Sequence, residues 1–459
     1  MVYLHWMILA VYVVVIVATM TAVLMDNRQP VKTMAWLMVL VFLPVVGIVL
    51  YFFFGQNIRK ERMISQRSMD QLTKRSMLEF AEQQNLHIPE NQLPLMRLFA
   101  NQNFALPFKD NNVEIYTSGY EFFPALLADI ARAVHHIHLS TYIIEDDPLG
   151  NLVADALIAK AREGVEVRLI YDDVGCWRVR DSFFERLRDN GLDVHSFMPV
   201  KFPAFTSKVN YRNHMNIAMR YVKGTRRYAW RDTHLRIEGG GVYAIQRTFL
   251  VDWYFVDRTL LTKRLYYPDV SPTINNDCLM QVVTSSPVTP WPDIMQGYVR
   301  ILLQAKYYVY METPYFLPTE PILFAMRTAA LGGVDVRLMI PLHSDAKLVE
   351  WASRSYVLET VEAGVKIYFY EAGFNHSKFL VSDDTVATCG STNVDFRSFE
   401  NNFEANAFFY GKEMALRLKT VFLDDQQHCQ LIEEVTDISH RPFLTRLWES
   451  LVRLLSPLL

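Results

Sequence analysis

Cysteine is scarce in this chain: its 459 residues include only four, and no two of them form a C-x-x-C pair. Scattered cysteines of this kind are interpreted as reduced, packed thiols, which predicts a reducing compartment for the soluble part. No metal-binding spacing stands out among the 12 histidines, so the sequence predicts no metal site. The net charge is only −3 and argues neither for nor against an anionic partner.

Charge is also missing from two long runs near the N-terminus. Residues 6–25 form an uncharged run of 20 and residues 33–54 a second run of 22, each long enough to cross a bilayer. A signal peptide is the alternative for the first run. However, His5 is the only basic side chain before that run, so a signal peptide's basic n-region is missing. No small-x-small cleavage site follows the run either. We therefore predict that residues 1–55 form a two-span transmembrane hairpin.

Basic residues follow the second run closely: Arg59, Lys60, Arg62, Arg67, Lys74 and Arg75. By the positive-inside rule, they place the large domain in the cytoplasm, as part of a multi-pass protein of the inner membrane. Residues 56–110 are polar and rich in Gln and Asn, and we expect them to be a helical linker.

The chain after the linker contains one pattern twice. Strand-like apolar runs alternate with helical stretches, which predicts an α/β fold of mixed sheets flanked by helices. Residues 164–169 (GVEVRL) match residues 333–338 (GVDVRL), and Arg212-Asn213-His214 matches Phe374-Asn375-His376. The sequence therefore predicts two copies of one lobe, over residues 111–270 and 271–459.

The second copy carries the motif around which the chain is organised. His376 and Lys378 are two residues apart, so on an extended strand both point to the same face, and Asp383 falls in the turn that follows. The sequence Gly-Ser-Thr-Asn, ending at Asn393, comes shortly afterwards. The alternative is a surface strand that carries a His and a Lys by chance, but the offset of the second motif argues against it.

These residue types fit phosphoryl transfer. An imidazole attacks phosphorus covalently, an ammonium group neutralises the phosphate oxygens, and a carboxylate holds the other imidazole nitrogen in one tautomer. In a duplicated protein, a second histidine can protonate the leaving oxygen. The candidate catalytic residues are therefore His376, Lys378, Asp383 and His214.

The first copy departs from this motif. Position 216, where Lys is needed, is Asn, and position 221, where Asp is needed, is Tyr. In the second copy, His376 and Asn393 are 17 positions apart. If Asn216 corresponds to Asn393, the same spacing in the first copy, from His214, is only 2, which is 15 residues shorter. We interpret this as a deletion of a strand, its turn and the returning strand; sequence drift, the alternative, seldom shortens a spacing while preserving both flanks. Other segments must then close the gap, or the lobe folds poorly.

Several other residues are candidates for substrate binding: Asn393, Ser391, Glu404 and His234. Glu404 is expected to buttress the site. For His234, whose strand also carries Asp232 and Arg236 on the same face, a hydrogen-bonded structural role is the alternative. Glu312 either lies near the site or caps its sheet.

Two further stretches have two interpretations each. Residues 201–236 carry nine basic residues and one acidic residue, which form either a solvated face or a surface that attracts anionic lipid. Residues 443–455 carry an apolar stripe, which favours a core-packing helix over one on a membrane surface.

The motif H-x-K-x4-D with G-S-x-N resembles the phospholipase D superfamily, and the chain as a whole is similar to bacterial cardiolipin synthases. The similarity extends to Pro44-Val45-Val46-Gly47, Trp230-Arg231-Asp232-Thr233-His234 and Thr313-Pro314-Tyr315-Phe316. It implies that two phosphatidylglycerols react to give cardiolipin and glycerol, without a metal or other cofactor, through a phosphatidyl-histidine. It also implies that Lys378 and Asn393 hold the phosphate and that Asp383 supports its histidine. Which histidine attacks stays open.

The incomplete first motif predicts an impaired or inactive enzyme. The alternatives are a phospholipase D-type hydrolase and a pseudoenzyme that binds phosphatidylglycerol and other anionic phospholipids or pairs with an intact homologue. A homo-oligomer is compatible with the sequence. Nuclease activity also occurs in the superfamily, but paired spans place the site beside lipid, so we expect no nucleic-acid partner.

Overall fold

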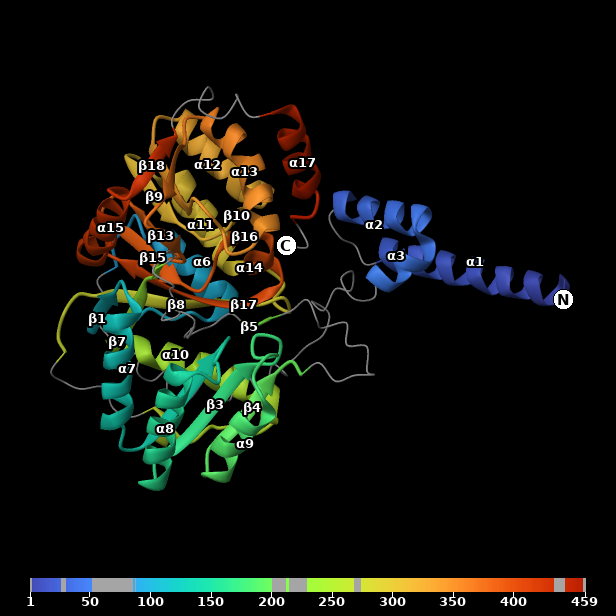
Figure 1. The fold of residues 1–459 in the computed structure, drawn as a ribbon. Helices are drawn as coiled ribbons and strands as arrows, with labels where there is room; N and C mark the ends of the chain where they lie inside the picture. The colour runs from blue at the N-terminus through green and yellow to red at the C-terminus, as the bar shows by residue number, and fades with distance from the viewer. Residues whose placement is uncertain are drawn as a thin grey trace.

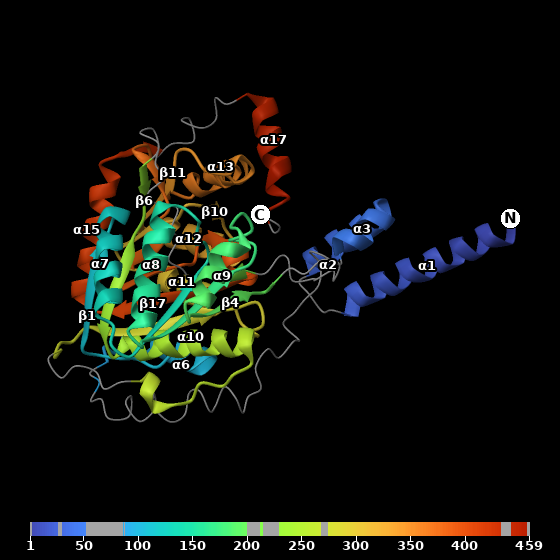
Figure 2. The same ribbon diagram turned by 60° about the horizontal axis from the view of Figure 1, so that its bottom comes forward.

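The computed structural model describes residues 2–25, 30–51, 86, 88–199, 212–213, 229–267, 274–432 and 442–456. Two α/β lobes lie against each other, and three N-terminal helices stand apart from them in both views (Figure 1 and Figure 2). The mixed sheets flanked by helices agree with the predicted fold class.

The N-terminal helices are α1 (Val2–Met25), α2 (Pro30–Phe42) and α3 (Pro44–Leu50). The second uncharged run is divided at Leu43, since Pro44 has no backbone N–H and begins a new helix. No helix in the described part of the chain is long and apolar enough to cross a membrane. The two-span hairpin therefore stays a prediction from the sequence.

The first lobe is built on a parallel sheet of three strands in the order β2-β3-β4. Helical crossovers join these strands, as parallel pairing requires. In chain order this part contains β1 (Asn111–Tyr116), α7 (Gly119–Arg132), β2 (His136–Thr141), α8 (Pro148–Arg162), β3 (Glu166–Asp172), α9 (Asp181–Asp189) and β4 (Asp193–Phe197). Then come β5 (Arg212–Asn213), β6 (Ala229–Arg231), β7 (His234–Gly239), α10 (Gly241–Asp257) and the 3-10 turn η4 (Arg264–Tyr266).

The second lobe repeats this order and then extends it. It begins with β8 (Leu279–Ser285), α11 (Asp293–Gln304), β9 (Tyr308–Glu312), β10 (Phe316–Leu317), α12 (Glu320–Leu331), β11 (Asp335–Pro341), α13 (Lys347–Val361) and β12 (Lys366–Tyr370). It continues with β13 (Gly373–Asn375), β14 (Phe379–Ser382), β15 (Val386–Gly390), β16 (Val394–Asp395), α14 (Phe396–Glu400), β17 (Asn402–Tyr410), α15 (Lys412–Gln426), β18 (Cys429–Ile432) and α17 (Phe443–Arg453).

The sheets of the two lobes differ at one place. In the second lobe the strand order is β18-β12-β11-β9-β14-β15-β17-β5, and β8 pairs with β17 as well. The hairpin β14–β15 therefore connects β9 to β17 within one sheet. In the first lobe β2 ends one sheet, β7 pairs only with β1, and no strand in the described ranges connects the two. Helix α10 packs against both sheets instead. Loss of a hairpin equivalent to β14–β15 would produce this difference.

Two short strands tie the lobes together. Strand β6 of the first lobe pairs in parallel with β13, and β5 pairs in parallel with β17. Part of the predicted linker also belongs to this body, because α6 (Leu93–Asn103) buries Leu95, Met96 and Phe99 in the core of the second lobe. The site described next lies beside the β6–β13 pair.

Candidate active site

His376 and Lys378 lie in the short connection between β13 and β14 rather than inside a strand. Their side chains nevertheless meet, as the spacing predicts: the Lys378 Nζ atom is 2.9 Å from Nδ1 and 3.1 Å from Nε2 of His376. Lys378 also donates to the His376 carbonyl oxygen, at 2.5 Å. Leu380, two residues further, is fully buried in the core.

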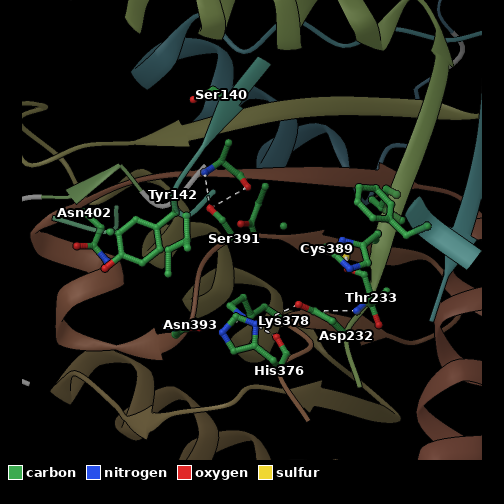
Figure 3. A pocket seen from close by; sticks show the side chains of 18 of the residues that line it. Ser140, Tyr142, Asp232, Thr233, His376, Lys378, Cys389, Ser391, Asn393 and Asn402 are labelled. Atoms are coloured by element: carbon green, nitrogen blue, oxygen red, sulfur yellow. Dashed lines mark hydrogen bonds and ion pairs between the residues drawn. The ribbon is translucent and has the colours of Figure 1, made fainter. Parts of the chain in front are cut away.

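Asp232 supplies the carboxylate partner of the histidine. Its Oδ2 lies 3.0 Å from His376 Nδ1 (Figure 3). The contact follows from the β6–β13 pairing, which sets Arg231 opposite Asn375, and the His376 N–H donates to the Arg231 carbonyl oxygen at 2.7 Å. One lobe therefore contributes the imidazole and the other contributes its carboxylate.

The assignment of Asp383 as the support of His376 is wrong. Asp383 does lie in the turn after β14, with φ of +52°, but its carboxylate accepts the backbone N–H groups of Lys306, Tyr307 and Tyr308 at 2.7–2.9 Å. These groups precede and begin β9, the strand beside β14. Asp383 therefore anchors the turn to the neighbouring strand, which is a structural role.

Burial dominates the electrostatics of this cluster. Burial and then the charge of Lys378 lower the pKa of His376, so the imidazole is neutral near pH 7. Burial also lowers the pKa of Lys378. For Asp232, burial would raise the pKa, but the charge of Lys378 and the hydrogen bond from His376 outweigh it and hold the pKa below its ordinary value. A neutral imidazole that donates from Nδ1 to Asp232 keeps its lone pair on Nε2.

A buried network lies behind the cluster. Arg231 forms an ion pair with Asp425, with an Nη2–Oδ2 distance of 2.6 Å, and Asn375 donates to Glu312 at 2.9 Å. Burial and the neighbouring Asp425 raise the pKa of Glu312 well above its ordinary value. Of the two interpretations of Glu312, the structure supports the one that places it near the site, beneath Asn375.

The cluster opens into a cavity of about 1600 Å³ that both lobes line. Three of the predicted binding residues, Ser391, Asn393 and His234, face it. Glu404 does not, but it accepts hydrogen bonds from Ser391 and from Asn402, the latter at 3.1 Å, and so buttresses the wall as expected. His234 stacks on Phe122 with ring centroids 4.2 Å apart, and burial lowers its pKa.

His214 lies outside the described residues, so its predicted role is unchanged. The residue before it is held firmly. Asn213 donates through its backbone to Asp172 at 3.1 Å and through its side chain to Asp252 at 3.0 Å. Strand β5 pairs with Asn402 and Phe403, so Asn213 lies next to the part of the cavity wall that Asn402 forms.

Arg397 is a further cation on the cavity wall. Its buried Nε has no hydrogen-bond partner among the described residues, and no ion pair to it occurs there either. The sequence places Arg397 just after the Gly-Ser-Thr-Asn turn, but nothing in its spacing indicates a role. In the described ranges, no group of three or more His, Cys, Asp or Glu side chains is arranged to hold a metal ion.

Comparison with known proteins gives two family matches. The family described as cardiolipin synthase, PLD-like domain, matches residues 298–426, and the phospholipase D-nuclease N-terminal family matches residues 8–56. The phosphatidylserine synthase of Haemophilus influenzae superposes with a TM-score of 0.61 at 14% identity, over 80% of this chain and 100% of that one. This similarity shows a shared fold.

Full-length relatives are more specific. A cardiolipin synthase of Alkalihalophilus pseudofirmus is 38% identical over 459 residues, covering 95% of this chain and 90% of that protein. The major cardiolipin synthase of Bacillus subtilis is 36% identical and covers 98% of both chains. With this level of identity over nearly the whole length, the chain belongs to the cardiolipin synthase family of the phospholipase D superfamily.

Proposed function

We propose that this protein transfers a phosphatidyl group from one phosphatidylglycerol to another, forming cardiolipin and glycerol. The observation that carries the proposal is the contact of Asp232, His376 and Lys378 at one cavity, in a chain of the cardiolipin synthase family. An oriented neutral imidazole beside a cation is suited to attack phosphorus.

The reaction takes two displacements. In the first, an imidazole Nε2 forms a bond to phosphorus, the bond from phosphorus to the glycerol oxygen breaks, and a second histidine gives that oxygen a proton. In the second, the same histidine takes the proton from a hydroxyl of the second phosphatidylglycerol, whose oxygen attacks phosphorus and releases the imidazole. His376 and His214 divide these two roles between them.

Each side chain of the cavity has a part in this scheme. Asp232 holds His376 in the tautomer with its proton on Nδ1 and stabilises positive charge on the ring when it forms. Lys378, Asn393 and Ser391 hold the phosphate oxygens, and Glu404 positions Ser391. Arg397 supplies a further positive charge on the cavity wall, one without an ion pair among the described residues.

The first lobe limits the rate in this proposal. Its motif lacks Lys and Asp, and its sheet is divided between β2 and β7. Loss of one preorganised charge from such a site costs about 100-fold or more in rate. We therefore expect slower synthesis than in a relative with two complete motifs.

The membrane is the proposed location, with the lobes on the cytoplasmic side of the inner membrane. Two sequence features support it: two uncharged runs, and basic residues after the second run. The N-terminal helices add a third, because many of their large apolar side chains are exposed, Tyr3 by 90% and Trp6 by 66%. Their burial in lipid would remove this apolar surface from water.

The test is to express the chain in membranes that lack cardiolipin and to analyse the lipids by mass spectrometry, with His376→Ala as the matched control. Cardiolipin that disappears in the control supports the proposal. Phosphatidic acid in its place identifies a hydrolase. If the protein is present and folded but neither product forms, the chain is a pseudoenzyme that binds anionic lipid or pairs with an intact homologue.

A further inference from the structure

Helix α17, near the C-terminus, carries its apolar side chains on the outside. The sequence favours a core-packing helix for this stripe, and the structure shows that this prediction is wrong. Phe443, Leu444 and Leu454 are 74–75% exposed, and Leu447, Trp448 and Leu451 are 45–50% exposed. Six large apolar side chains on one face of one helix form a surface that a soluble monomer rarely leaves uncovered.

The opposite face holds α17 on the second lobe. Val452 and Glu449 are buried against the lobe. Arg453 forms an ion pair with Glu359 of α13 at 2.5 Å and lies 4.0 Å from the centroid of the Tyr356 ring. The exposed stripe is therefore presented by a docked helix, and turning it inward would break these contacts.

We propose that α17 lies on the surface of an anionic phospholipid bilayer, with this stripe in the boundary between head groups and acyl chains. The proposal rests on the proposed function in one respect: phospholipid substrates are dissolved in that bilayer. A helix with one apolar face that includes Trp and Phe, flanked by arginine, has the composition of interfacial helices. Arg446 supplies a cation on the exposed part of the helix.

The position of α17 supports a bilayer over other occupants. Both views place it at the edge of the lobe pair that faces the N-terminal helices (Figure 1 and Figure 2). Those helices also expose large apolar side chains, including Tyr3, Trp6 and Met7. Two apolar surfaces on the same side of the molecule fit a single lipid surface that contacts both.

The experiment measures where Trp448 lies without requiring turnover. The full chain is reconstituted in vesicles of phosphatidylglycerol with bromine on the upper acyl carbons, and tryptophan fluorescence is recorded. Trp351 lies against Trp448 with ring centroids 5.8 Å apart, so the signal of Trp448 is taken as the difference between Trp351→Phe and Trp351→Phe combined with Trp448→Phe. We expect quenching of Trp448, its loss in Leu447→Glu combined with Leu451→Glu, and its retention in Thr445→Glu combined with Ser450→Glu, which adds the same two charges at exposed positions outside the stripe.

Three results would overturn the proposal. Trp448 that is not quenched excludes insertion of the stripe. Equal quenching in brominated phosphatidylcholine excludes the requirement for anionic lipid. Shielding of Trp448 that rises with protein concentration, without quenching, identifies a second copy as the occupant. Because no step needs catalysis, quenching in a preparation that makes no cardiolipin would refute the proposed function and leave the lipid contact standing.

Discussion

The carboxylate of Asp232 and the imidazole of His376 lie 3.0 Å apart although 144 residues separate them in the chain. Neither lobe contains both groups, so the histidine is oriented only where β6 of the first lobe pairs with β13 of the second. The interface between the lobes is therefore part of the proposed catalytic site, and the β6–β13 pair connects the first lobe to His376.

Replacing Asp232 with Asn should lower the rate of cardiolipin formation by about 100-fold or more. The amide would donate to Nδ1 and leave the ring proton on Nε2, where it blocks attack. The measurement is the initial rate in phosphatidylglycerol vesicles, per mole of folded protein. A rate within threefold of the wild type would show that Asp232 does not orient the catalytic ring.

Asp383→Ala should act on stability instead. It leaves the N–H groups of Lys306, Tyr307 and Tyr308 without their acceptor, at a cost of about 1–3 kcal/mol. We expect a lower Tm in detergent and an unchanged rate per mole of folded protein. A selective loss of rate with no change in Tm would return Asp383 to the catalytic group.

Asp232 and Asp383 show which parts of the candidate site can be predicted from the sequence and which cannot. Local spacing is sufficient for His376, Lys378 and Asn393, because all three lie on one short stretch whose geometry is set by neighbouring residues. The partner of His376 depends on strand pairing between the lobes, and sequence reasoning noted Asp232 only as one of three polar residues on a strand face. The partners of Asp383 depend on which strand lies beside β14, which no local pattern specifies.

The fold shows the same limit. Alternating strands and helices predict two α/β lobes, and the 15-residue shortening indicates where the first lobe departs from the second. Periodicity also identifies α17 as amphipathic, but it does not tell which face packs against the protein. That choice is made by Arg453, which pairs with Glu359 on another helix.

The stability of the first lobe should depend on pH through Asp252. Burial raises the pKa of this carboxyl from about 3.8 to about 7, although Asn213 donates a hydrogen bond to it. Between these values the unfolded chain binds fewer protons than the folded one, so the free energy of unfolding falls as pH rises from about 4 to about 7. Asp252→Asn should remove this dependence and raise the Tm at pH 8.

The control for this prediction lies on the same helix. Asp257 is 27% exposed, and Asp257→Asn should not remove the fall in Tm that the buried Asp252 causes. Thermal unfolding of the three proteins from pH 4 to pH 8 makes the comparison. If the wild type and Asp252→Asn follow parallel curves, Asp252 is ionised in the folded protein throughout that range.

Arg397 should bind the anionic substrate. We expect Arg397→Gln to raise the lipid concentration needed for half-maximal rate about tenfold or more, since the cavity loses a cation that has no ion pair in the described structure. Arg397→Lys should recover part of the effect because it keeps the charge. Arg132→Gln, on α7 outside the cavity and 67% exposed, is the matched control and should change nothing. An effect in both Gln variants would indicate general attraction to the membrane instead of a site.

Restoring the missing hairpin tests the deletion itself. We would insert 15 residues between His214 and Met215, with the sequence of residues 377–391 of the second lobe. This insert returns a Lys and an Asp at the spacing of the intact motif and supplies two strands that can pair with β2 and β7. We expect a higher Tm and a rise in the rate of about 100-fold, measured by thermal unfolding and by lipid mass spectrometry.

Two further insertions of the same length separate the causes of such a gain. A Gly-Ser insertion should produce neither effect, because it restores length without strands or charge. The hairpin insertion with its Lys replaced by Met should raise the Tm as the intact hairpin does, since it closes the sheet. It should raise the rate of cardiolipin formation only slightly, because the phosphate site is still incomplete. If the Gly-Ser insertion performs as well as the hairpin, the division between β2 and β7 does not arise from a lost pair of strands, and drift of the first motif becomes the better explanation.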